Sequence, residues 1–154
     1  MVLVASFAVL RRRTSVTIGR PVEDVFAVLS DVEKTATRHP ATVEEYWTSE
    51  GETRVGSTRR AVAKSWGVRS ENEAEVTIYE PGRALGLKSI DSPIPFEIGI
   101  QFQEVDEATQ VEWDVAMDPS GVFRLFGSSV MNAFMKQLDL GLGQLKTQME
   151  SNEL

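Results

Sequence analysis

The longest periodic pattern of apolar positions lies in the last thirty residues of the chain. From Gly121 to Glu150 an apolar residue recurs every three or four positions, namely Phe123, Phe126, Val130, Phe134, Leu138, Leu142, Leu145 and Met149. This spacing is that of one face of an α-helix. The pattern predicts a helix roughly 40 Å long, with an apolar stripe that packs against the rest of the molecule.

Shorter segments before this helix alternate between apolar and polar residues, as strands do. In the clearest one, Ala74, Val76 and Ile78 share one face, and Glu73 and Glu75 lie on the other. Turn-forming residues separate the segments. We expect strands over Thr14–Ile18, Thr42–Thr48, Ser57–Ser65, Glu73–Tyr79, Ala84–Ile90, Phe96–Val105 and Gln110–Met117.

Two short helices are expected between the first and second strands. Pro21 suits a first helical turn, where its missing N–H has no partner in any case, so residues 21–30 predict one helix. Ser30 or Asp31 can begin a second, which Pro40 ends at or before His39.

This order of elements predicts an α+β fold. We expect one domain over residues 1–154, in which a curved antiparallel sheet of about seven strands packs against the long C-terminal helix. A helix laid across such a sheet can enclose a cavity. Residues 1–10 form either an N-terminal extension or an early start of the first strand.

Composition narrows the classes of function. The chain has 154 residues, no cysteine and a formal net charge of −7, so disulfides, thiolate metal sites and cysteine nucleophiles are excluded. The absence of cysteine fits the cytoplasm, and the negative charge disfavours nucleic-acid partners. The apolar run Val2–Leu10 is too short to span a membrane and lacks a preceding positive charge, so neither stable membrane insertion nor a signal peptide is expected.

Several short motifs resemble those of the START and polyketide cyclase/dehydrase (SRPBCC) superfamily, which has a helix-grip fold. They are the run from Ile18 to Phe26 with Leu29-Ser30-Asp31, the His39-Pro40 step, Val76 to Arg83, Thr109 to Trp113, and the C-terminal helix. The resemblance implies binding or carriage of a hydrophobic, lipid- or polyketide-like small molecule between sheet and helix. It also leaves open an enzyme of the cyclase/dehydrase type acting on such a ligand.

Under this resemblance, large apolar side chains are the expected cavity walls. An ordinary filled core would use the same residue types, and only the resemblance favours a cavity. The expected ligand-binding residues are Trp66, Val76, Phe96, Ile100, Trp113, Phe123, Phe126, Val130 and Phe134.

Three polar groups could serve chemistry at the cavity: His39, Arg60 and Tyr79. His39 is the only histidine, and a loop residue held by Pro40 is the simpler explanation. Arg59 and Arg60 point to opposite faces of one strand, so one of them could face the cavity and the other solvent. Surface charge on an edge strand is the commoner explanation for both.

No catalytic triad, cofactor fingerprint or set of metal ligands occurs in the sequence. The strand glutamates Glu71, Glu73 and Glu75 lack a neighbouring histidine or cysteine and are expected to face water. We therefore expect no metal and no cofactor, and a hydrophobic small molecule as the partner. Monomer and dimer both remain open.

Overall fold

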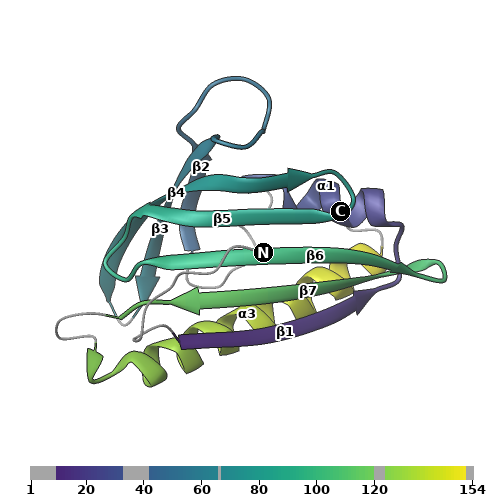
Figure 1. The fold of residues 1–154 in the computed structure, drawn as a ribbon. Coiled ribbons are helices and arrows are strands. Elements are labelled where there is room, and N and C mark those ends of the chain that lie inside the picture. The colour runs from purple at the N-terminus through teal and green to yellow at the C-terminus, as the bar shows by residue number, and fades with distance from the viewer. Residues whose placement is uncertain (1–9, 33–41, 66, 120–123, 152–154) are drawn as a thin grey trace.

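The computed structural model describes residues 10–32, 42–65, 67–119 and 124–151. Seven strands form one antiparallel sheet in the order β1-β7-β6-β5-β4-β3-β2 (Figure 1). Two helices complete the described part, α1 (Val22–Leu29) and α3 (Gly127–Glu150). The strands are β1 (Leu10–Ile18), β2 (Thr42–Trp47), β3 (Thr58–Ser65), β4 (Val68–Glu80), β5 (Ala84–Asp91), β6 (Phe96–Val105) and β7 (Ala108–Met117).

The predicted α+β fold and its seven-stranded sheet are confirmed. One short helix follows the first strand within the described residues, and the second one expected there falls mostly on residues 33–41, outside the described part. Strand β1 begins at Leu10, four residues before the predicted start at Thr14. No helix of the described residues is long and apolar enough to cross a membrane.

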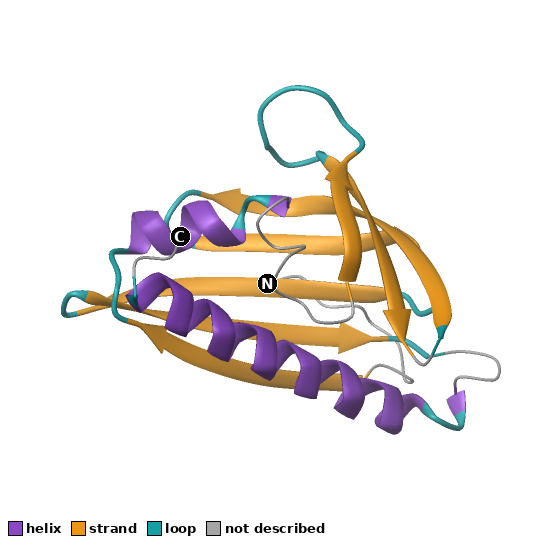
Figure 2. Cartoon of the chain, turned by 180° about the vertical axis from the view of Figure 1, so that it is seen from behind, coloured by secondary structure: helices purple, strands orange, loops and turns teal. Residues whose placement is uncertain are grey.

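Both helices lie on the same side of the sheet (Figure 2). The pairing of β2 with β3 shifts register between Thr42 and Glu44, and the pairing of β4 with β5 shifts twice. Such bulges increase the local twist and bend the strand that carries them. The sheet therefore curves, and its concave face looks toward α1 and α3.

One of these bulges changes which residues of β4 face inward. Val76 pairs with Leu87 and Ile78 pairs with Gly86, so Thr77 is the extra residue. Tyr79 then packs on the core with its ring 5.6 Å from that of Phe26, instead of Ile78 as strict alternation predicts. Gly86 permits this arrangement, because a Cβ there would lie 2.6 Å from Thr77 Oγ1.

Helix α1 packs on β6 and β7 through Val22, Val25, Phe26 and Val28, which are all buried. Pro21 stands immediately before its first residue, and the acidic Glu23 and Asp24 lie in the first turn, where the helix dipole favours negative charge. The sequence predicted this helix over residues 21–30, in agreement with the observed Val22–Leu29.

Helix α3 runs beside β1, and its C-terminal end is tied to the turn that follows β1. Lys146 Nζ donates to the Thr17 carbonyl at 2.6 Å, and Arg20 donates to the Met149 carbonyl at 2.8 Å. The backbone N–H of Gly19 donates to Glu150 at 2.9 Å. Lys146 Nζ also donates to Glu150 Oε2 at 2.7 Å. This bond, followed by the one from Gly19, holds the pKa of Glu150 below its ordinary value.

The N-terminal half of α3 departs from the predicted stripe. The helix begins at Gly127, and its buried residues there are Met131 and Met135, whereas Phe126 precedes the helix and is 62% exposed. Each step of four residues overshoots a full turn by about 40°, so Phe126 lies roughly 120° around the helix axis from Leu138. Val130 and Phe134 lie between these directions and are half-buried.

Met131→Ala should lower the free energy of unfolding by about 2–5 kcal/mol, because Met131 is fully buried and truncation leaves a cavity. The neighbouring Asn132 is exposed, so Asn132→Ala is the matched control and should change the stability little. Urea unfolding midpoints measure both. Equal midpoints for the two variants would show that α3 does not pack in this orientation.

Candidate functional site

A small cavity lies between the concave face of the sheet and the end of α1. Its volume is about 60 Å³, and the described residues that line it come from α1 and its end, from β2, β4, β5, β6 and β7, and from the loop after β2. Strands β2 and β7 are five places apart in the sheet, roughly 24 Å along a flat sheet. Only strong curvature brings both to one small cavity. The apolar lining residues are Leu29, Val32, Trp47, Val76, Leu85, Leu87, Ile98, Ile100 and Trp113.

Strand register explains why these residues meet. Cross-strand partners share a face of the sheet. Leu85, Ile100 and Trp113 form one row of partners, and Val76, Leu87 and Ile98 form the next. Both rows lie on the concave face. The pairing of the strands therefore produces a continuous apolar wall, although no single strand carries a sequence motif for ligand binding.

Among the residues proposed from the sequence, Val76, Ile100 and Trp113 line this cavity. Phe96, Val130 and Phe134 are partly buried against the same core but are not among its described lining residues. Trp66, Phe123 and His39 lie outside the described residues. The ligand-binding role of the three lining residues stays a prediction.

Three placements are corrected. Phe126 is exposed, for the geometric reason given above, and lies away from the cavity lining. Arg60 points to the opposite face from Arg59, where it pairs with Glu71 at 3.2 Å and with Glu73 at 3.3 Å. Tyr79, the third polar group, packs against Phe26 in the core instead of lining the cavity.

Arg59 is the arginine that faces inward, and it is held by Glu45. The Arg59 Nε lies 3.1 Å from Glu45 Oε1, and Arg59 also donates to Asn72 Oδ1 at 3.1 Å. The two charged side chains are only 7% and 9% exposed. Glu45 lines the cavity, so this buried ion pair forms the charged end of a mostly apolar wall that also includes Ser30 and Thr53.

Burial dominates the electrostatics of this pair. Desolvation raises the pKa of Glu45 above its ordinary value, although the Arg59 charge opposes it, and burial likewise lowers the pKa of Arg59. Sequence reasoning considered an inward arginine but missed Glu45. The alternation in β2 could have placed Glu45 on the same face as Trp47, which also lines the cavity.

Trp113 carries a second unusual polar group. The side chain is 8% exposed, and its indole Nε1 has no hydrogen-bond partner among the described residues. Leaving a buried donor unpaired costs about 1–3 kcal/mol, and native structures rarely do so.

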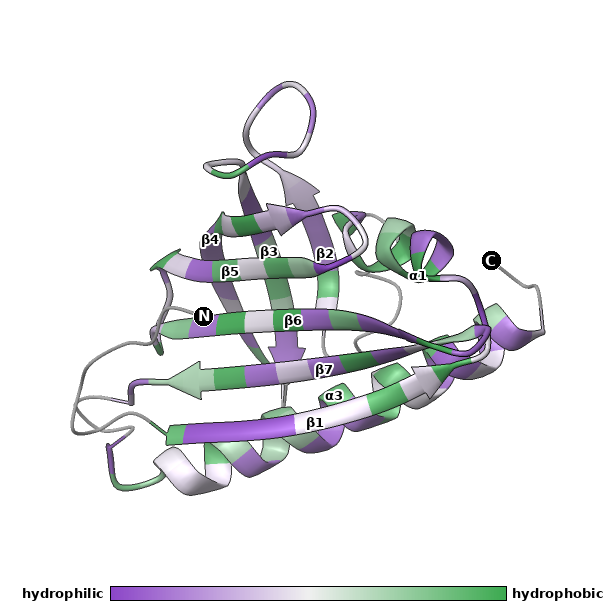
Figure 3. Ribbon diagram, turned by 45° about the vertical axis from the view of Figure 1, so that its right-hand side comes forward, coloured by the Kyte–Doolittle hydropathy of each residue, from purple (hydrophilic) through white to green (hydrophobic). Residues whose placement is uncertain are grey.

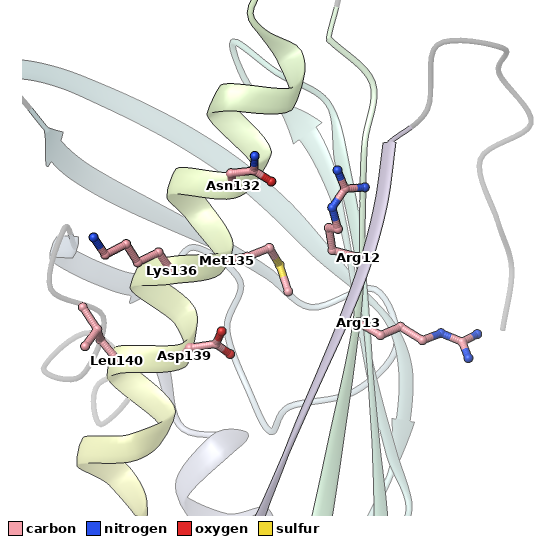
Figure 4. A pocket seen from close by; sticks show the side chains of 7 residues that line it. All are labelled: Arg12, Arg13, Asn132, Met135, Lys136, Asp139 and Leu140. Atoms are coloured by element: carbon pink, nitrogen blue, oxygen red, sulfur yellow. The ribbon is translucent and has the colours of Figure 1, made fainter.

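A second hollow, between β1 and α3, has the character of an open surface. It has a volume of about 480 Å³ and is lined by Arg12, Arg13, Asn132, Met135, Lys136, Asp139 and Leu140 (Figure 4). All of these except Met135 are exposed. Arg12 and Arg13 leave β1 on opposite sides, and Figure 3 shows how hydrophilic this stretch of β1 is. The cavity on the concave face is therefore the stronger candidate for an apolar ligand.

Comparison with known families identifies the fold and the group of proteins. Residues 10–150 match the family model described as polyketide cyclase / dehydrase and lipid transport. The chain belongs to this family. No curated protein sequence is significantly similar to it.

Several solved structures resemble the chain closely in fold and only distantly in sequence. A protein from Thermus thermophilus has a TM-score of 0.78 at 15% identity, covering 94% of this chain and 100% of that one. A START superfamily protein from Mycobacterium smegmatis has a TM-score of 0.75 at 12% identity, covering 90% and 98%. The Zhui aromatase/cyclase from Streptomyces sp. R1128 has a TM-score of 0.74 at 17% identity, covering 92% and 96%.

Arg59→Met should lower the free energy of unfolding by roughly 3–5 kcal/mol, because it leaves the Glu45 carboxylate buried without a counter-charge. Arg60→Met on the same strand is the matched control, and its more exposed ion pairs should contribute no more than about 1 kcal/mol. Chemical denaturation of both variants measures the difference. Similar losses for the two would contradict the buried position of Arg59.

The raised pKa of Glu45 makes stability depend on pH. The folded state binds this proton more tightly than the unfolded chain, so Glu45 contributes most below its unfolded pKa of about 4.3. That contribution is lost as the pH rises through the folded pKa. Glu45→Gln removes the titration, so the variant's free energy of unfolding should rise relative to that of the wild type as the pH increases above about 4. A constant difference, or the opposite slope, would count against the assignment.

Proposed function

We propose that the protein binds a small, largely apolar molecule in the cavity between the concave face of the sheet and α1. The observation that carries this proposal is the cavity wall itself. Apolar side chains from α1 and five strands line the cavity, and the charge of Glu45 is balanced by its ion pair with Arg59. Membership of a family described by lipid transport as well as cyclase chemistry supports it.

The size of the cavity bears on the size of the ligand. Binding sites for drug-sized molecules usually enclose about 300–1,000 Å³, several times the 60 Å³ found here. A ligand with one ring or a short chain requires the least movement of the lining side chains. Met131 and Met135 belong to the same core cluster as several of the lining residues, and their flexible side chains can repack at low cost when a ligand enters.

Binding or carriage fits the buried polar groups better than catalysis does. A cyclase or dehydrase would be helped by a cation free to polarise a carbonyl, and Arg59 already holds Glu45 and Asn72. Enzymatic turnover of a cyclase/dehydrase type remains the alternative within this family. Native mass spectrometry of freshly purified protein would identify a co-purified molecule and supply the substrate to test for turnover.

The hydrocarbon α-methylstyrene, a single ring with a short apolar branch, is a suitable probe. We expect a dissociation constant near 0.1 mM, about −5.5 kcal/mol, measured by titration calorimetry. Leu87→Asp should weaken binding at least tenfold, because Leu87 lines the cavity and a carboxylate there repels the hydrocarbon.

The matched control is Ile90→Asp, which lies on the same strand but is exposed. Ile90→Asp should leave the affinity unchanged. Equal weakening by the two substitutions, in variants whose circular dichroism shows them folded, would place the probe outside the cavity.

A further inference from the structure

We propose that the ligand of this cavity is uncharged and presents a hydrogen-bond acceptor, such as a ketone, ester carbonyl or ether oxygen, to the indole N–H of Trp113. This inference rests on the proposed function, because it specifies the chemistry of the molecule bound in the same cavity. It assigns to Trp113 a role in specificity beyond that of an apolar wall.

The first argument is the unsatisfied donor. The indole nitrogen can only donate, and Trp113 is 8% exposed with no partner for Nε1 among the described residues. The hydroxyl of Thr14, its cross-strand partner on β1, donates to Asp139 at 2.6 Å, and the Thr14 oxygen accepts no hydrogen bond from the indole. Ile100, its partner on β6, has an apolar side chain. Neighbouring side chains on the sheet therefore leave the N–H to an acceptor that arrives with the ligand.

The second argument concerns the apolar surroundings of that donor. Trp113 shares the cavity with Leu85, Leu87, Ile98 and Ile100. The hydroxyl residues Ser30 and Thr53 also line the cavity, at its α1 end and in the loop after β2. A few polar groups in a mostly apolar wall fix the orientation of a ligand without requiring much polarity in it. The ligand then consists of an apolar body with an acceptor at one position.

The third argument excludes a charged ligand. Glu45 is the one ionisable side chain among the described residues that line the cavity, and Arg59 neutralises it at 3.1 Å. A bound carboxylate would lie near the Glu45 carboxylate with no free cation to balance it. A bound amine would lie near a carboxylate whose charge is already matched. An ion buried without compensation is costly, so the wall selects against either sign.

Three ligands of nearly equal size, α-methylstyrene, acetophenone and benzoate, test separately the need for an acceptor and the need for an uncharged ligand. Acetophenone has a carbonyl oxygen where α-methylstyrene has a CH₂ group, and benzoate is anionic. Titration calorimetry gives their affinities for the wild type and for Trp113→Phe, which keeps an aromatic ring but removes the donor. Trp47→Phe, at another tryptophan of the cavity wall, is the matched control.

We expect Trp113→Phe to weaken acetophenone binding about tenfold and α-methylstyrene binding by less than about twofold. Trp47→Phe should not distinguish the two ligands, and benzoate should bind the wild type at least tenfold more weakly than acetophenone. In wild-type protein labelled with ¹⁵N, acetophenone should also move the Trp113 indole proton downfield, and α-methylstyrene should not. This measurement uses only the wild-type protein, so it still tests the proposal if Trp113→Phe fails to fold.

Equal losses for acetophenone and α-methylstyrene in Trp113→Phe, or an indole proton that acetophenone leaves unmoved, would overturn the assignment while leaving the proposed function intact. Benzoate bound as tightly as acetophenone would overturn the claim that the ligand is uncharged. If none of the three binds, the proposed function fails and this inference fails with it.

Discussion

Curvature of the sheet is the constraint on which the rest of the structure depends. A flat seven-stranded sheet would leave β2 and β7 far apart, and neither helix could enclose a space against both. The register shifts in β2 and β4 supply the bend, and Gly86 provides the close approach that the second shift in β4 requires. Residues from distant strands of the sheet, Glu45 and Trp113, then line one cavity.

This curvature also explains how the protein tolerates a buried ion pair. Arg59 and Glu45 come from adjacent strands near the β2 edge, and the bend turns their face inward. A buried pair of this kind stabilises a fold little compared with apolar side chains of similar size, but removing one partner is costly. We infer that the pair helps to keep the cavity end of the sheet in one arrangement and leaves the apolar wall electrically neutral.

Most of the fold could be predicted from the sequence because strand alternation and helix periodicity are local signals. The segments β6 and β7 illustrate this, since their predicted bounds agree with the structure to within two residues. Long-range register is not a local signal. The sequence of β4 contains no pattern that predicts the bulge by which Tyr79 faces inward. In α3, apolar residues spaced four apart look like one helix face, although each step rotates the position around the axis and Phe126 ends at the surface.

The candidate site was less predictable for the same reason. Val76, Ile100 and Trp113 were identified because apolar residues at alternating positions in a strand generally face a core. Alternation in β2 puts Glu45 on the same face as Trp47, but only the pairing of β2 with β3 shows that this face turns inward and brings Glu45 beside Arg59. Charged residues on a strand usually face water, so the sequence alone favoured a solvated position for both.

A crystal structure of the protein with bromobenzene tests the central claim most directly, because the bromine can be located by its anomalous scattering. The account predicts one strong bromine peak in the cavity bounded by Val76, Ile100 and Trp113, accompanied by movement of the neighbouring side chains. A bromine peak only in the open groove of Met135 and Leu140, with the concave cavity unchanged, would contradict it.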